Sequence, residues 1–143
     1  MSFTENEIVE FFQMNNIEPN VLVSNNERII LSTDLGLPDY DLNFKISLTY
    51  NYALNSAQAS TVGFMHYSSG VDMMSLYDAI ININNRCGAP KFSLDQERCE
   101  VTITLHSEHI DSLIVLHQMI FLLAASAGEE YPVLANIINS SKS

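Results

Sequence analysis

The sequence predicts a two-layer α+β sandwich, in which helices cover one face of an antiparallel sheet, with the element order α-β-β-β-β-α-β-β-α. Two observations support this class. Apolar and polar residues alternate in short runs within 21–67 and again within 92–105, as in strands with one buried face. Before, between and after these regions, apolar residues recur at helical spacing instead. The polar strand positions hold Ser, Thr, Asn and Lys, which indicates that the second sheet face meets water.

The first predicted helix begins at a capping box. In Thr4-Glu5-Asn6-Glu7, the Thr4 hydroxyl and the Glu7 carboxylate each accept a hydrogen bond from the backbone amide of the other residue. The helix is expected to end before Pro19. Its apolar residues form one stripe that must pack against another element, and they are Ile8, Phe11, Phe12 and Met14.

Four strands are predicted in the region that follows the first helix. The clearest strand is the alternation over 44–50. The segment 33–41 is rich in turn formers and is expected to be a loop, and a polar turn is expected at 55–59. The other three strands are predicted at 21–24, 28–32 and 60–67. Together these strands predict an antiparallel meander.

The middle of the chain predicts a helix followed by a hairpin. Asp72 is expected to cap the second helix, and Gly88-Ala89-Pro90 ends it. Two alternating runs within 92–105 form the hairpin, with a turn at 95–98.

The last predicted helix opens at Ser107 or Asp111 and is apolar on nearly every side. Gly128 and Pro132 are expected to bend the chain into a short terminal helix over 133–138. Nothing in the sequence indicates a second domain, so residues 1–143 are expected to form one unit.

The charge balance excludes several classes of partner. Seventeen acidic and six basic residues give a formal net charge of −11, which repels nucleic-acid phosphates and anionic lipid headgroups. We therefore expect no nucleic-acid or membrane partner.

The apolar stretch 113–128 is shorter than the roughly 18 residues that a membrane-spanning helix needs. The first residues lack the pattern of a signal peptide and two cysteines suit a reduced compartment, so we expect a cytoplasmic protein.

No set of residues predicts a catalytic centre or a cofactor site. The glycines are scattered, without a phosphate-binding loop, and Cys87 and Cys99 read as small buried side chains. The best enzyme candidate is a metal site formed by His106, His109 and Asp111, but these residues lack a known ligand spacing. The sequence predicts a non-enzymatic regulator or chaperone-like protein that binds another protein or a polypeptide segment. One alternative is a chaperone that keeps a segment of an effector extended, and the other is a metal-dependent enzyme.

Three asparagines lie near the end of the second predicted helix. Asn82, Asn84 and Asn85 are unusual there, because asparagine is a weak helix former that competes for backbone hydrogen bonds. The expected role is structural, tying the helix end to a neighbouring segment. The alternative is a polar recognition cluster.

The third predicted helix has more apolar surface than one sheet can cover. We expect one side to pack on the sheet and Val115, Met119 and Leu122 to point the other way. A second copy of the chain would cover these residues, because a patch on a twofold axis is complementary to itself. The alternative is that the terminal helix folds back over them. The residues expected to face the sheet are Leu113, Ile120 and Ala124, with Ile110, Ile114 and Phe121 nearby.

The stretch 76–107 resembles the YbjN-like family of bacterial sensory transduction regulators. The resemblance is carried by the Ile81-Asn82-Ile83-Asn84 helix end, the run Lys91-Phe92-Ser93-Leu94-Asp95 and the strand over 101–105. It implies a fold similar to class I type III secretion chaperones, which are small acidic cytoplasmic proteins that often dimerise. It transfers Asn82 and Asn84 or Asn85 as characteristic positions, and no catalytic residue.

Overall fold

The computed structural model describes residues 2–86 and 88–140. Within these residues, three α-helices and seven strands follow one another, with one short 3₁₀ helix. Their bounds are α1 Glu5–Met14, β1 Asn20–Ser24, β2 Arg28–Leu37, η1 Pro38–Tyr40, β3 Leu42–Asn51, β4 Ser56–Val62, β5 Met65–His66, α2 Met73–Arg86, β6 Lys91–Asp95, β7 Glu100–Ser107 and α3 Leu113–Ser140.

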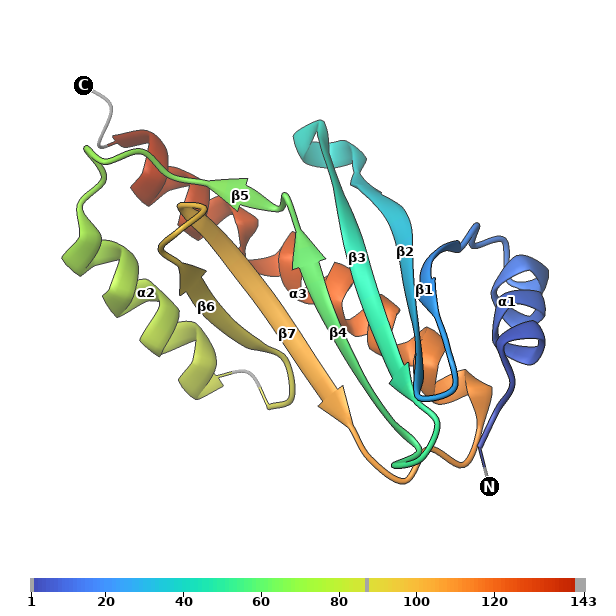
Figure 1. The fold of residues 1–143 in the computed structure, drawn as a ribbon. Helices are drawn as coiled ribbons and strands as arrows, with labels where there is room; N and C mark the ends of the chain where they lie inside the picture. Colours follow the sequence, from blue (N-terminus) through green and yellow to red (C-terminus); the bar gives the residue numbers. More distant parts are fainter. Residues whose placement is uncertain (1, 87, 141–143) are drawn as a thin grey trace.

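All seven strands belong to one antiparallel sheet. Strands β1, β2, β3, β4 and β7 are neighbours in that order, while β5 and β6 both pair with β7. Figure 1 shows α3 running diagonally behind the sheet, with α1 beyond β1 at one end and α2 beside β6 at the other. None of the described helices covers the front face in this view. The structure therefore confirms the predicted α+β sandwich with helices on one face.

The capping box predicted for α1 is present. The Glu7 amide donates to Thr4 Oγ1 at 3.2 Å, and the Thr4 amide donates to Glu7 Oε1 at 3.1 Å. Ile8 and Phe12 are buried and fix α1 to the rest of the molecule. Met14, by contrast, is exposed.

Strand β2 is longer than predicted. The segment 33–41 was expected to be a loop, but β2 continues to Leu37 and pairs residue by residue with β3, down to Leu37 opposite Leu42. Only η1 and Asp41 connect the two strands. The prediction failed because turn formers such as Asp34 tolerate a strand when the neighbouring strand supplies a continuous ladder.

The strand predicted at 60–67 is two strands. Strand β4 already begins at Ser56, inside the expected turn, and ends at Val62. The chain then turns at Gly63, which has a φ of 75°, and β5 pairs with β7 alone. The buried Glu100 carboxylate accepts a hydrogen bond from the Gly63 amide and holds this turn. The observed order therefore has one more strand than the predicted order.

Helix α3 continues where a bend was expected. It passes through Gly128 and Pro132 without interruption, so the predicted separate helix over 133–138 is wrong. Tertiary contacts on both sides of Pro132 explain the difference. The Tyr131 ring stacks on Tyr40 with ring centroids 4.6 Å apart, and the Leu134 side chain is buried. Pro132 is exposed, so its ring points away from these contacts.

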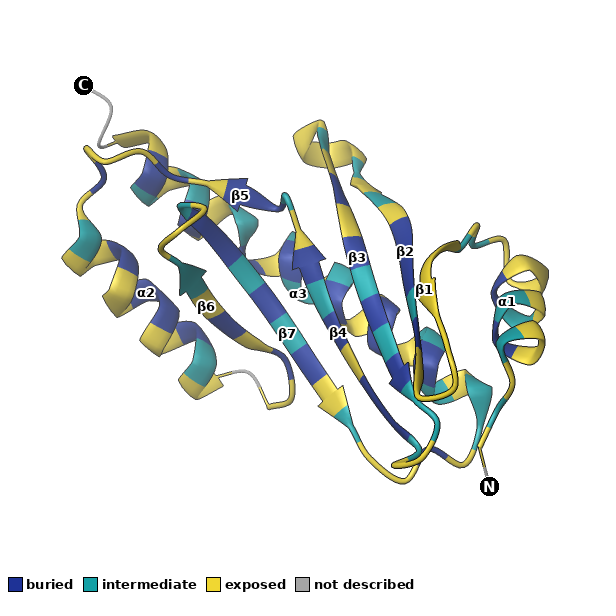
Figure 2. Ribbon diagram, in the orientation of Figure 1, coloured by how far each residue is buried: buried dark blue, intermediate teal, exposed yellow. Residues whose placement is uncertain are grey.

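The length of α3 also differs from the expectation. The helix has 28 residues, and by length and composition it could span a membrane. The core helix of a soluble protein meets the same criterion. Here α3 packs against both the sheet and α2. Its buried residues (Figure 2) are Leu116, Met119, Ile120, Leu123, Ala127, Glu130, Leu134 and Ile138.

Asp72 caps α2 as predicted. Its carboxylate accepts hydrogen bonds from the Ser75 amide at 3.2 Å and the Ser75 hydroxyl at 2.8 Å. The hydroxyl bond, followed by the amide bond, lowers the pKa of Asp72 below its ordinary value.

Because the folded-state pKa of Asp72 is lowered, its charge contributes stability that is fully present above the ordinary aspartate pKa. This contribution to the free energy of unfolding should disappear as the pH falls through the lowered pKa of Asp72 in the folded state. Asp72→Asn keeps a capping side chain but does not titrate, so the stability difference between the two proteins should shrink in that acidic window. Denaturation curves at a series of pH values measure it. A difference that is independent of pH would contradict the assignment.

Candidate functional site

The predicted interface on α3 is partly wrong. Met119 is only 3% exposed, because it shares one face with the buried Leu116 and Leu123. Val115 is half-buried, and Leu122 is exposed as expected. The sequence could not decide the rotation of this helix, because apolar residues occupy nearly every side of its first half.

The exposed apolar side of α3 is formed by other residues. Ile114 and Phe121 were expected to lie near the sheet, but they are 54% and 67% exposed. With Leu122, which is 44% exposed, they form what we call the α3 patch. Phe121 and Leu122 also line a shallow depression together with His117 and Gln118.

His117 connects the α3 patch to α1. Its side chain is half-buried, and its ring meets the Phe11 ring edge-on with centroids 6.4 Å apart. Met14, which is exposed, lies one helical turn beyond Phe11 and extends apolar surface along α1. The position of His117 fits the core or interface role that the sequence suggests.

Strand β1 forms an open edge of the sheet. Among the described residues it pairs only with β2, and all five of its residues are exposed (Figure 2). Val21, Leu22 and Val23 give it an apolar character, and the strand contains no lysine or proline. The register of its pairing with β2 shifts between Val21 and Val23, and the rest of such an edge offers unpaired backbone groups to another extended chain.

The opposite edge, at β6, is occupied by a side chain. The Asn84 amide donates to the Phe92 carbonyl at 2.9 Å, and the Phe92 amide donates to Asn84 Oδ1 at 2.7 Å. The side chain thus imitates a neighbouring strand and ties the end of α2 to β6. This geometry fits the structural role expected for Asn84. Asn82 and Asn85, in contrast, are exposed.

Asn84→Ala should lower the free energy of unfolding by roughly 1–3 kcal/mol, because both half-buried backbone groups of Phe92 lose their partner. Asn82→Ala is the matched control and should change stability by less than about 0.5 kcal/mol. Chemical denaturation of the three proteins measures both values. Unchanged stability of the Asn84 variant, combined with lost partner binding, would make Asn84 a recognition residue instead.

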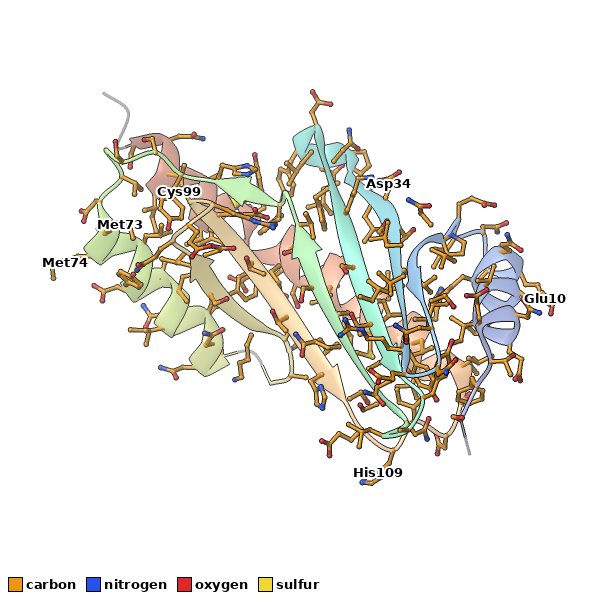
Figure 3. All side chains as sticks on the ribbon, in the orientation of Figure 1. Glu10, Asp34, Met73, Met74, Cys99 and His109 are labelled. Atoms are coloured by element: carbon orange, nitrogen blue, oxygen red, sulfur yellow. The ribbon has the colours of Figure 1, made fainter. Side chains whose placement is uncertain are left out.

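The two histidines of the alternative metal site are exposed, with His106 near the end of β7 and His109 in the connection that follows. His106 Nε2 lies 3.4 Å from Glu108 Oε1, and both side chains are more than half exposed. His109 has a φ of 53° and lies beyond the end of the sheet (Figure 3), and Asp111 is exposed. Across residues 2–86 and 88–140, no three His, Cys, Asp or Glu side chains gather as metal ligands would.

Of the two cysteines, the structure describes Cys99, which is a free thiol. Cys99 is half-buried rather than buried, and it lies in the β6–β7 turn with a φ of 51° (Figure 3). Its thiol approaches the Gln96 carbonyl at 3.7 Å. Cys87 lies outside the described residues.

The architecture defines a class, an α+β sandwich with an open sheet edge and an exposed apolar helix side. No family model, no curated protein and no solved structure matched the chain.

Proposed function

We propose that this protein is a non-enzymatic cytoplasmic module that forms a homodimer and binds a polypeptide, as a regulator or a chaperone-like protein. The α3 patch is the observation that carries the proposal. Three large apolar side chains lie exposed on one side of α3, a helix whose other side packs on the sheet. On the surface of a soluble protein, a contiguous apolar patch of this kind often marks a site of interaction with another protein.

A second copy is the partner that fits the α3 patch best. Two antiparallel copies of one helix side are complementary by symmetry, so each Phe121 would pack on the other copy. A stable interface buries about 800 Å² on each partner. The α3 patch is smaller than this, so the interface must extend along α3 to Val133 or onto Met14 of α1, which are also exposed.

The strand edge supports the binding of an extended segment. Strand β1 is open, whereas Asn84 occupies the β6 edge. A polypeptide added to β1 would gain main-chain hydrogen bonds, and its side chains could contact Leu22. This observation favours a second candidate function, a secretion-type chaperone that holds a segment of an effector extended.

We also propose kinship with the YbjN-like proteins. The support is the order of elements and the link between α2 and β6, in which Asn84 belongs to the stretch that carries the resemblance. Under this proposal α3 is a core helix and not a membrane anchor, and the protein needs neither a cofactor nor nucleic acid.

The dimer is tested by light scattering coupled to gel filtration. At micromolar concentration, a mass near twice the 16.0 kDa of one chain supports it, and a mass near 16.0 kDa refutes it. Crosslinking in the source cells followed by mass spectrometry would identify the polypeptide partner. Recovery of a secreted protein would favour the chaperone candidate.

A further inference from the structure

The open sheet edge at β1 is apolar in its middle and acidic at both ends. The side chains of Val21, Leu22 and Val23 are 40%, 55% and 38% exposed. Glu18 lies just before the strand, Glu27 lies in the turn that follows it, and both are exposed. An extended chain that pairs with β1 therefore meets apolar side chains at its centre and a carboxylate towards each end.

The same end of the molecule carries a surplus of negative charge. Residues 1–28 contain five glutamates, and Arg28 is the one arginine or lysine among them. Helix α1, which lies beyond β1 (Figure 1), carries three of these glutamates, and Glu10 projects outward from it (Figure 3). A surface with this charge attracts a cationic partner and repels an anionic one.

Main-chain pairing alone cannot give this edge a strong preference for one partner. Strand β1 has five residues, and the register of its pairing with β2 shifts between Val21 and Val23, as at a β-bulge. A bulge leaves one residue outside the ladder and twists the strand, so an added strand forms fewer main-chain hydrogen bonds there. The charges at the two ends of β1 therefore contribute to the choice of partner.

A second copy of β1 is a poor occupant of this edge. If two copies of β1 paired in an antiparallel arrangement, Glu18 of one copy would approach Glu27 of the other at both ends of the ladder. Like charges opposite each other destabilise a sheet, and charged residues at an edge oppose self-association. A segment with a lysine or arginine at each end replaces these two repulsions with two attractions.

We propose that β1 binds an extended polypeptide segment with alternating apolar residues at its centre and a lysine or arginine at each end. This inference rests on the proposed binding of a polypeptide at β1, and it adds the chemical class of that polypeptide. The apolar side chains of the segment pack on Val21, Leu22 and Val23, and its two cations lie beside Glu18 and Glu27. None of these residues belongs to the α3 patch.

The first test is a titration of the full ¹⁵N-labelled chain with the blocked peptide Lys-Val-Thr-Val-Thr-Val-Lys. The backbone amide signals of residues 20–24 should shift in a saturable way. The same core with a glutamate at each end should bind about tenfold more weakly, because two attractions become two repulsions. The lysine peptide with N-methyl groups on its five central residues keeps its charge but loses its main-chain donors, and it should not shift these signals.

The outcomes separate this inference from the proposed function. Equal binding of the lysine and glutamate peptides at residues 20–24 would overturn the basic class of partner but would support a polypeptide site at β1. Absence of shifts with both peptides would overturn the polypeptide site as well. Binding of the N-methylated peptide as tight as that of its parent would reveal general attraction to an acidic surface, and it too would overturn the proposal.

The second test removes the two charges that flank β1. Glu18→Gln combined with Glu27→Gln should weaken binding of the lysine peptide several-fold. The control combines Glu97→Gln with Glu129→Gln, which removes the same charge from exposed positions elsewhere, and binding should stay within about twofold of the wild type. Equal effects of the two pairs would contradict the site, because only net charge would then matter. The Phe121→Glu variant should bind the peptide like the wild type, so failure of the dimer gives a different result.

Discussion

Replacing Phe121 with glutamate is expected to reduce the mass in solution from about twice 16.0 kDa to about 16.0 kDa. The residue lies at the centre of the α3 patch with most of its ring exposed, so the substitution does not disturb the core. In a symmetric dimer, two glutamates would meet in an apolar contact, where an unpaired charge is strongly unfavourable. Light scattering at several concentrations, together with a circular dichroism melt, measures association and folding separately.

The matched control for this variant is Met74→Glu. Met74 is 78% exposed and projects from α2, away from the α3 patch (Figure 3), so this protein should remain a dimer. Met119→Glu cannot serve the same purpose, because Met119 is buried and its replacement should unfold the chain. A Phe121→Glu protein that keeps the wild-type dimer mass would remove α3 from the interface.

Asn55→Ala is expected to lower the free energy of unfolding by about 2–5 kcal/mol. Its side-chain amide donates to the Ile110 carbonyl at 2.7 Å, and its Oδ1 accepts from the hydroxyl of the buried Tyr50. The Ile110 amide in turn donates to the Asn55 carbonyl at 3.1 Å, so the β3–β4 turn is joined to the segment before α3. Alanine would leave polar groups without partners and would strain a backbone with a φ of 49°.

Two further variants separate these contributions. Asn55→Gly relieves the backbone strain and should recover about 1 kcal/mol of the loss. Asn51→Ala removes only an exposed bond, in which the Leu54 amide donates to Asn51 Oδ1 at 3.0 Å, and should cost less than about 1 kcal/mol. Equilibrium urea denaturation measures all four proteins. An Asn55→Ala value within about 0.5 kcal/mol of the wild type would show that this junction is not important for stability.

The amino-acid sequence alone determined the features that depend on neighbouring residues. The starts of α1 and α2 follow from Thr4 and Asp72, whose side chains bond amides three residues away. The strand alternation in β3 and β7 follows from the period of two, which requires no knowledge of the partner strand. These local rules were sufficient to predict an α+β sandwich with one helix-covered face.

Only the tertiary structure decided which side of α3 is buried and where the chain turns. Nearly every position in the first half of α3 is apolar, so only the packing of the folded chain shows that Met119 is buried and Phe121 is exposed. Stacking of Tyr131 on Tyr40 keeps α3 continuous past Pro132, and these two residues lie far apart in the sequence. The pairing of Arg86 with Glu130 joins α2 to α3 in the same way. Such contacts depend on how distant segments are brought together, and no local pattern encodes them.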